Sequence, residues 1–266
     1  MLIATEHLGA VGVGITVPQF FRADDGNIYV VKFQDNRLNS RVAVSELFAA
    51  KIGQIMGLCF PPSDIIAVDE QMVSENPGLL EVGINVGLHF ASRFLDHTEY
   101  VGKNGLYKAI NVSELAGVLL FDHMFHNADR ARNKKNLLLR LEGEEYKVYA
   151  IDNSHLFRSS RWAIDSFHQL GSRIKIYYVQ HYRNLLKDLL YAQDFLPYLE
   201  KVKMISGEQI DCIVREIPYE WMPDEPERLA LAEYTKMRRD MADEIWNRIW
   251  KQIPRSRGGR RSLFAK

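Results

Sequence analysis

One stretch of the chain decides the fold. Residues 126–139 read HNADRARNKKNLLL, and residues 150–153 read AIDN. In order, they contain an acid (Asp129), an amide (Asn136), an apolar triplet and, after a short gap, a second acid (Asp152). Single Asp and Asn residues are common in turns because their side chains bond nearby backbone groups. Turn chemistry alone does not require this order, so we interpret the three residues as one functional set.

The gap between the amide and the second acid predicts a β-hairpin. Residues 136–140 and 146–151 are predicted as two strands that flank a turn containing Gly143. Such a hairpin returns Asp152 close to Asn136. Magnesium prefers hard oxygen ligands and takes one or two carboxylates beside substrate phosphates. We therefore predict that Asn136 and Asp152 hold Mg²⁺.

The first acid suits a different role. Phosphoryl transfer needs little covalent help from the protein, but it needs a group that orients the attacking hydroxyl. Asp129 is our candidate for that catalytic residue, and the adjacent Arg130 is an accessory candidate. Together with a metal site, this set predicts an ATP-dependent kinase.

The N-terminal part supplies a candidate lysine and its partner carboxylate. Residues 27–33 are rich in β-branched and aromatic side chains and predict a strand that carries Lys32 near its end. Residues 44–58 predict a helix with Glu46 in its first turn. An acid there could simply favour the helix N-terminus through the dipole. We prefer an ion pair in which Glu46 holds Lys32 for the ATP phosphates.

A glycine-rich turn at residues 9–19 precedes this strand. Backbone N–H groups approach a phosphate closely only where side chains are absent, so Gly12 and Gly14 are candidate nucleotide contacts. Thr16 either adds a hydroxyl to a phosphate or simply favours the strand. The turn lacks the Gly-Lys-Ser/Thr ending of a P-loop, and the strand that follows it argues against a dinucleotide fingerprint.

Residues 87–96 predict a strand that runs into a linker. In a kinase, this position gives backbone groups and apolar surface to adenine. Phe94 and Leu95 are our candidates for that contact, with ordinary core residues as the alternative.

With these residues, the chain resembles the HipA-like kinases, which share catalytic logic with phosphoinositide kinases and, more distantly, with protein kinases. The resemblance rests on the Gly-rich turn, Val30–Phe33, Ser45–Leu47, Asn127–Arg130, Asn133–Leu138 and Ile151–Asp152. It implies that Lys32 contacts the phosphates of ATP and that Glu46 positions this lysine. It also implies that Asp129 acts on the acceptor hydroxyl and that Asn136 and Asp152 hold magnesium.

The spacing of the amide departs from that of protein kinases. There the metal-binding Asn follows the catalytic Asp by about five residues, and in this chain that position is Lys134. We favour Asn136 as the ligand because it directly precedes the apolar residues 137–139, as the metal-binding Asn does in the kinases that the chain resembles. Asn133 then becomes a loop-stabilising or accessory contact.

The overall pattern predicts an α+β, bilobal, protein-kinase-like fold. Residues 1–95 read mostly as strands with one helix, and residues 96–254 read mostly as helices apart from the hairpin. We expect a small N-lobe and a larger C-lobe. At 266 residues with 47% hydrophobic content, the chain can bury a sizeable core. Residues 255–266 form a basic tail, for which we expect disorder.

Charge and cysteine content argue against several classes. Lys and Arg number 34 and Asp and Glu number 34, so no global charge favours nucleic acid or an anionic membrane. We expect no direct DNA binding and no membrane partner. The two cysteines give neither a disulfide framework nor a zinc site, and the N-terminus lacks a signal-peptide pattern. We therefore expect a cytoplasmic protein.

Two further features have simple interpretations. Asp122 is either a buried acid that anchors the Asp129 loop or an ordinary exposed one. Residues 225–253 predict a final helical segment whose aromatic side chains pack onto the rest of the protein.

Several functions stay open at this point. The resemblance favours a protein Ser/Thr kinase, with a lipid or small-molecule kinase as the alternative. A non-catalytic nucleotide-binding pseudokinase is a further alternative, against which the presence of Lys32, Asp129 and Asp152 together argues. The resemblance alone implies a regulatory partner, as for a toxin that works with a DNA-binding protein.

Overall fold

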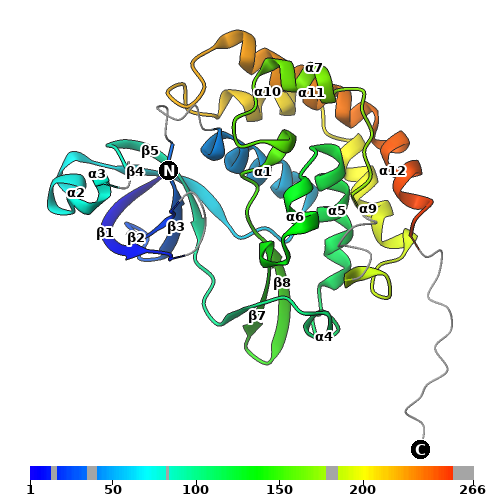
Figure 1. Ribbon diagram of the computed structural model, residues 1–266, viewed down its shortest axis with the longest axis horizontal. Helices are drawn as coiled ribbons and strands as arrows, with labels where there is room; N and C mark the ends of the chain where they lie inside the picture. The colour runs from blue at the N-terminus through cyan, green and yellow to red at the C-terminus, as the bar shows by residue number, and fades with distance from the viewer. Residues whose placement is uncertain (13–16, 35–40, 82–83, 178–184, 254–266) are drawn as a thin grey trace, which may run out of the picture.

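The computed structural model describes residues 1–12, 17–34, 41–81, 84–177 and 185–253. Its N-terminal part is rich in strands and its C-terminal part is mostly helical, which confirms the α+β prediction (Figure 1). The strands are β1 Leu2–Ala10, β2 Gln19–Ala23, β3 Ile28–Lys32, β4 Ser63–Val68, β5 Gly87–Arg93, β6 Thr98–Tyr100, β7 Leu137–Glu142 and β8 Glu145–Ala150. The helices are α1 Val42–Met56, α2 Glu70–Glu75, α3 Gly78–Glu81, α4 Lys103–Leu106, α5 Leu115–Met124, α6 Ala128–Arg132, α7 Ile164–Leu170, α9 Ala192–Lys203, α10 Gly207–Arg215, α11 Glu225–Asp240 and α12 Ala242–Trp250, with short 3₁₀ turns η2 Val112–Glu114, η3 Lys134–Asn136 and η4 Leu156–Arg158.

Five strands close into a barrel in the order β1-β2-β3-β5-β4. Neighbouring strands run antiparallel except β1 and β4, in which Leu2 pairs with Ile66 in parallel. Side chains alternate along β3, so Val31 is fully buried in the barrel core and Lys32 projects from the opposite face. The two-residue period of the strand thus directs the lysine away from the barrel interior.

Helix α1 begins at Val42, two residues before the predicted start. The backbone N–H of Arg41 donates to the carbonyl of Ser160 at 2.8 Å, and the Arg41 guanidinium bonds Glu227 at 2.6 Å. These tertiary contacts, which local sequence does not encode, fix the chain just before the helix. At the other end, Gly57 adopts a left-handed φ of 69°, a conformation that glycine tolerates at a helix end.

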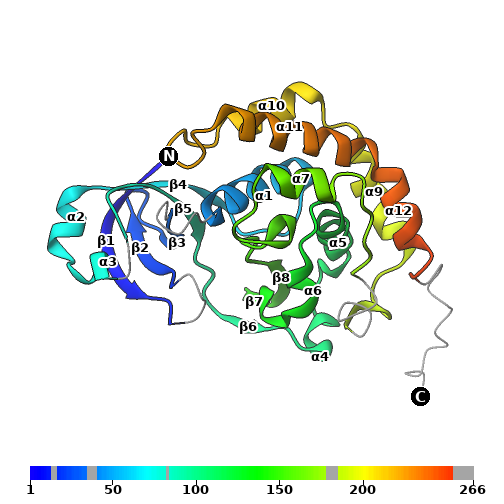
Figure 2. The ribbon, with the colours of Figure 1, turned by 45° about the horizontal axis from the view of Figure 1, so that its top comes forward.

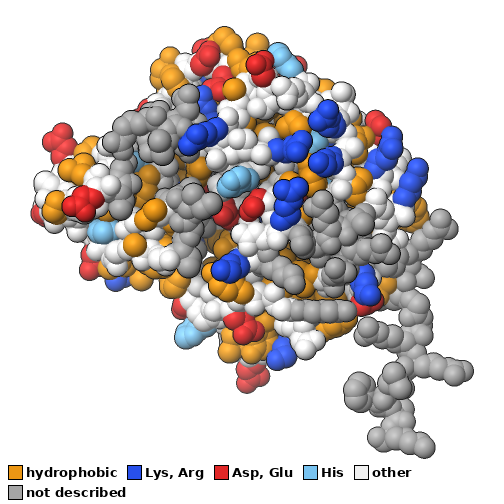
Figure 3. Space-filling view, viewed as in Figure 1, with side chains coloured by type: hydrophobic (Ala, Val, Ile, Leu, Met, Phe, Trp, Pro, Cys, Tyr) orange, Lys and Arg blue, Asp and Glu red, His pale blue; other side chains and the backbone are white. Residues whose placement is uncertain are grey.

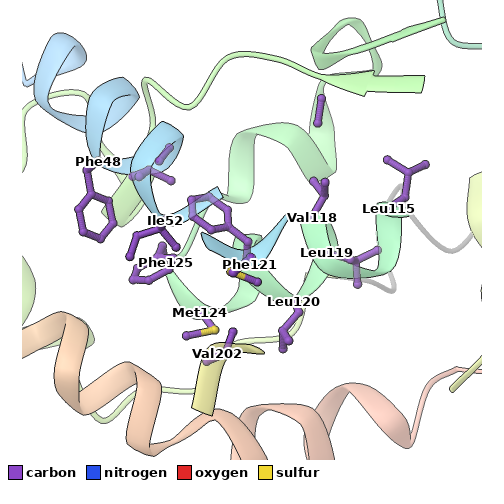
Figure 4. Close-up of a cluster of buried hydrophobic side chains, with 14 of the residues drawn as sticks. Phe48, Ile52, Leu115, Val118, Leu119, Leu120, Phe121, Met124, Phe125 and Val202 are labelled. Atoms are coloured by element: carbon purple, nitrogen blue, oxygen red, sulfur yellow. The ribbon is translucent and has the colours of Figure 1, made fainter. Parts of the chain in front are cut away.

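The apolar side of α1 packs into the larger of two groups of buried hydrophobic residues, together with α5 and α9. Figure 4 shows Phe48 and Ile52 of α1 next to Phe121 of α5 and to Phe125, the residue that directly follows α5. The rings of Phe48 and Phe125 lie 5.1 Å apart and are nearly perpendicular. Full burial of one such side chain stabilises by about 1.5–3 kcal/mol. The helix that carries Glu46 is therefore fixed to the helix that precedes Asp129.

A second sheet contains β6, β7 and β8 in that order. The β7–β8 hairpin turns at Gly143, whose φ of 62° suits glycine, and it pairs Leu137 with Ala150. The predicted hairpin is confirmed. At the open end of the hairpin, opposite the turn, the residues after β8 lie next to the start of β7.

The C-terminal helices cover α1 and α5. In Figure 2, α10 and α11 run along one edge of the molecule, with α1 and α7 beneath them. The predicted final segment is two helices, α11 and α12, which meet at Met241. Trp246 stacks on Phe195 at 4.9 Å and is buried, so the predicted packing is confirmed for this side chain, whereas Trp250 is 36% exposed. Among the described residues, no helix combines the length and the hydropathy needed to cross a bilayer.

The contact between α5 and α9 depends on a glycine. A Cβ atom added to Gly117 would lie 2.4 Å from the Tyr198 ring and 2.7 Å from Leu58. Alanine normally favours a helix interior, but overpacking of this kind costs about 1–3 kcal/mol. We expect Gly117→Ala to lower the free energy of unfolding measured in urea. Gly78→Ala is the matched control, because a Cβ there meets nothing within 4 Å; equal stability of the two variants would contradict the packing argument.

Candidate active site

Lys32 joins two carboxylates that are far apart in the sequence. Its Nζ atom bonds Glu46 Oε1 and lies 2.9 Å from Asp152 Oδ1. The Lys32 side chain is 13% exposed, Glu46 is 4% exposed and Asp152 is 34% exposed. The exposed fraction of the side chain therefore increases from Glu46 to Lys32 to Asp152, and Asp152 is the most accessible of the three. The predicted Lys32–Glu46 ion pair is present.

The position of Glu46 in its helix differs from the prediction. Because α1 begins at Val42, Glu46 is the fifth helical residue and lies beyond the first turn. The alternative in which it only supports the helix N-terminus is therefore wrong. Glu46 Oε1 also accepts a hydrogen bond of 2.9 Å from the backbone N–H of Asn153. The carboxylate thus holds both the lysine and the chain that follows Asp152.

Burial and ion pairing act in opposite directions on these groups. Burial alone would lower the pKa of Lys32, but Asp152 and Glu46 raise it well above its ordinary value. Burial would likewise raise the pKa of Asp152, but Lys32 and the Ser154 hydroxyl lower it well below its usual range. Burial raises the pKa of Glu46 despite its contact with Lys32. Lys32 is thus the cation that keeps Asp152 ionised.

Asp152 follows β8 in a left-handed conformation, with a φ of 62°. Asp tolerates this region better than most residues because its short side chain can bond locally. Ser154 provides such bonds, at 2.6 Å from its hydroxyl and 3.2 Å from its backbone N–H to Asp152 Oδ1. Just before this point, the backbone N–H of Ile151 donates to the Asn136 carbonyl at 3.0 Å. The hairpin therefore returns Asp152 to Asn136, as predicted.

Asp129 and Asn136 form the second half of the site. Asn136 Nδ2 donates to Asp129 Oδ2 at 2.7 Å. Asn136 is buried, whereas Asp129 is partly exposed. Asn133 instead accepts a bond of 3.1 Å from the backbone N–H of Lys135. This contact agrees with a loop-stabilising role for Asn133.

Arg130 connects the two halves. Its guanidinium pairs with Asp122 at 3.0 Å, and both side chains are fully buried. It also donates to the Ile151 carbonyl and to the Asn153 side chain. Asp122 is therefore the buried anchoring acid, one of the two alternatives open from the sequence. Loss of either partner would leave a buried charge, which is costly.

The oxygen atoms needed for a divalent cation are present. Within the described residues, Asn136 uses its Nδ2 atom for Asp129, so its Oδ1 atom stays available. Asp152 accepts the bonds from Lys32 and Ser154 at Oδ1, and its Oδ2 atom stays available. Hard cations such as Mg²⁺ prefer such oxygens. Asn136 and Asp152 therefore fit the predicted metal.

The other predicted nucleotide contacts are only partly described. Gly12 has a φ of 78°, which glycine tolerates, whereas Gly14 and Thr16 lie outside the described residues. Leu95 is buried, and the half-exposed Phe94 ring lies 5.1 Å from Phe20 of β2. A small cavity of about 20 Å³ lies next to both carboxylates and is lined in part by Glu46, Phe90, Ser92, Ile151 and Asp152.

Sequence reasoning missed the residues that hold Asp152 in place. Asn153 and Ser154 each bond a member of the site, and both directly follow Asp152. The signal that could have revealed them is that two polar residues directly follow a candidate site acid. Arg41 was also missed, because only the tertiary structure brings it to Ser160 and Glu227.

A lysine on a barrel strand pairs with an acid on the following helix, and a mostly helical part of the chain comes after them. This combination is typical of kinases. The chain belongs to the HipA-like kinase family, whose match covers residues 5–253. The resemblance found in the sequence is therefore confirmed.

Two solved structures are similar to this chain at low identity, and the first of them shows the same fold. The chain is similar to the Helicobacter pylori proinflammatory kinase CtkA, with a TM-score of 0.56 and 13% identity, over 88% of this chain and 94% of that one. It is also similar to HipA of Shewanella oneidensis MR-1, solved with HipB and operator DNA, with a TM-score of 0.48 and 11% identity, over 91% of this chain and 68% of that one. No curated protein matches the sequence.

The charge balance at Lys32 gives a test that needs no catalysis. The folded-state pKa of Asp152 lies below the value of about 3.9 in unfolded chains, so the carboxylate contributes stability above that pH and loses the contribution as the pH falls through its folded-state pKa. We expect Lys32→Met to raise the Asp152 titration midpoint in carboxyl NMR. Lys51→Met is the control, because it removes a surface pair with Glu216 instead. An unmoved midpoint in Lys32→Met would show that the lysine does not set this pKa.

The Arg130–Asp122 pair gives a second test. Arg130→Met leaves Asp122 buried without its partner, which we expect to lower the free energy of unfolding by about 3–5 kcal/mol. The double variant Arg130→Met/Asp122→Leu should recover much of that stability, since an apolar pair can replace a buried ion pair. Phosphoryl transfer should stay impaired in the double variant, because the bonds to Ile151 and Asn153 are still missing. Full activity in the double variant would rule out this positioning role.

Proposed function

We propose that this member of the HipA-like kinase family is an ATP- and Mg²⁺-dependent kinase that transfers the γ-phosphate to a Ser or Thr hydroxyl of a protein. One observation carries the proposal. Lys32 bonds Glu46 and Asp152 together, while Asp129 and Asn136 form a bonded pair at the start of the same hairpin. Adjacent segments of the chain thus supply the side chains that we propose bind the phosphates, the metal and the acceptor hydroxyl.

Each residue then has a separate task. Lys32 binds the phosphates of ATP, and Glu46 keeps its ammonium in position. Asp129 orients the acceptor hydroxyl and accepts its proton, since Asn136 bonds Oδ2 and leaves Oδ1 for the substrate. Asn136 and Asp152 hold Mg²⁺, which neutralises charge on the β- and γ-phosphates when it is bound. The bond of Asn136 to Asp129 supports the choice of Asn136 over Asn133 as the metal ligand.

Further residues of the N-terminal part are proposed to contact the nucleotide. Gly12, Gly14 and Thr16 approach the phosphates, and Phe94 and Leu95 face adenine. The strands of residues 1–95 form one lobe over the nucleotide, and residues 96–254 form the other, with α1 packed against the second. A cytoplasmic location and a regulatory partner remain predictions from the sequence.

The direct test is incubation of the purified protein with γ-labelled ATP and Mg²⁺, with and without cell extract. We expect label on protein, and a loss of at least about 100-fold in Asp129→Ala, the scale of a lost general base. ATP binding should persist in Asp129→Ala, whereas Asp152→Ala should weaken Mg²⁺-dependent ATP binding. Asn136→Ala and Asn133→Ala form a matched pair, of which only the first should abolish turnover.

Other results would point to the alternatives. ATP binding without turnover by the intact protein would indicate a pseudokinase. Label on an extracted lipid or small molecule, with none on protein, would indicate that class of kinase. Loss of turnover in Asn133→Ala but not in Asn136→Ala would reverse the metal assignment.

A further inference from the structure

We propose that Arg132, Arg158 and Arg173 form a binding site for acidic side chains of the protein substrate, next to its acceptor hydroxyl. We call these residues the arginine cluster. The inference rests on the proposed function, because it specifies which protein segments the same site accepts. All three side chains are exposed. They come from α6, from η4 and from the chain that follows α7.

Hydrogen bonds around His126 draw these three segments together. The backbone N–H of Phe157, next to Arg158, donates to the Phe125 carbonyl at 2.9 Å. His126 bonds the Tyr177 hydroxyl at 3.0 Å and the Leu170 carbonyl at 3.3 Å. The Leu170 carbonyl also accepts the backbone N–H of Arg173 at 3.1 Å. The arginines therefore surround one buried His–Tyr contact.

The electrostatics of that contact agree with this placement. Burial raises the pKa of the Tyr177 hydroxyl, while Arg158, Arg238, Arg132 and Arg173 act in the opposite direction. All four arginines are thus close enough to act on one hydroxyl. Figure 3 shows Lys and Arg side chains grouped over the region between α6 and α7.

Arg238 adds a buried positive charge beneath the arginine cluster. It is fully buried, and its guanidinium donates to four backbone carbonyls, those of His123, Met124, Gly171 and Arg173, at 2.8–3.1 Å. Three of these carbonyls lie at the ends of α5 and α7, where the helix dipole is negative. No carboxylate among the described residues forms an ion pair with Arg238. These carbonyl dipoles and the charge of Glu244 offset part of its positive charge, and only the remainder adds to the surface field.

The arginine cluster differs from other charged sites of this protein. Arg22 pairs with Glu6, Arg140 pairs with Asp96, and Lys236 pairs with Asp211. Within the described part of the chain, no member of the arginine cluster has such a carboxylate partner. Like charges repel, so three neighbouring arginines without counter-charges attract an anion. Guanidinium groups bind carboxylates through paired hydrogen bonds.

The position of Arg132 connects this anion site to the reaction. Arg132 follows Asp129 by three residues on α6, which puts both on one face, with Cβ atoms about 5–6 Å apart. Extended peptide advances about 3.3 Å per residue. An acid within one to three residues of the acceptor Ser or Thr can therefore reach the arginine cluster. A peptide fits better than nucleic acid, because the chain as a whole carries no net charge and the basic region is local.

Binding can be tested separately from catalysis. In the Asp129→Ala background, labelled peptides with a central Ser flanked by Glu, Gln or Lys are titrated by fluorescence anisotropy. We expect the Glu peptide to bind most tightly and to weaken with added salt. Arg132→Glu/Arg158→Glu should weaken it at least tenfold and should favour the Lys peptide instead. Arg248→Glu, an exposed arginine on α12, is the matched control and should change nothing.

Four results would overturn the inference. One is equal binding of the Glu and Gln peptides. The second is weaker ATP binding in the double variant, which would make the arginine cluster part of the nucleotide site. The third is tight duplex DNA binding that the double variant loses. The fourth is phosphorylation of Ser159 or Ser160 by the wild-type protein itself, if that phosphate prevents binding of the Glu peptide. Glu-peptide binding by a protein that transfers no phosphate would reject the proposed function, and the arginine cluster would then be a binding site for acidic peptides without a link to phosphoryl transfer.

Discussion

The Lys32 ammonium, held between Glu46 and Asp152, is the interaction on which the rest of the site depends. It links the barrel, helix α1 and the chain after the β7–β8 hairpin through one cation. Two carboxylates could not both stay ionised at this depth without it, because burial favours their neutral forms. The lysine thereby sets the charge of Asp152, which is the most accessible member of the three. The arrangement of segments and the ionisation state of the proposed metal ligand have the same physical cause.

A second network fixes the segment that carries Asp129 relative to the segment that carries Asp152. The guanidinium of Arg130 is planar and has several donors, so it can bond Asp122, Ile151 and Asn153 at once. Its fully buried pair with Asp122 fixes α6 against α5. The core contact of Phe48 with Phe125 then ties α5 to α1. Movement of Glu46 relative to Asp129 is therefore opposed both by polar bonds and by apolar packing.

Local patterns predicted the parts of this protein that local physics controls. The strand that ends at Lys32, the hairpin at Gly143 and the identity of Asp129, Asn136 and Asp152 follow from residue types and spacing. The start of α1 did not follow, because Arg41 is fixed by Ser160 and Glu227 from distant parts of the chain. For the same reason, the sequence could not show whether Glu46 stabilises the N-terminus of its helix through the dipole or forms an ion pair with Lys32. The tertiary structure decided it by placing Glu46 beyond the first turn, within reach of Lys32.

The sequence by itself determined the α+β class and the order of the candidate site residues, since these depend on residue types and on periods of two and 3.6 residues. Its motifs also sufficed for the resemblance to the HipA-like kinases, which the family match confirms. Only the tertiary structure determined which polar groups meet. It made Asp122 a buried anchor, it placed Arg238 against carbonyls at the ends of α5 and α7, and it gathered three arginines from separate segments. Such contacts join residues far apart in the sequence: Arg238 and Met124 are 114 positions apart, and Arg41 and Glu227 are 186 positions apart. Spacing along the chain carries no information about them, because they depend on how whole elements pack.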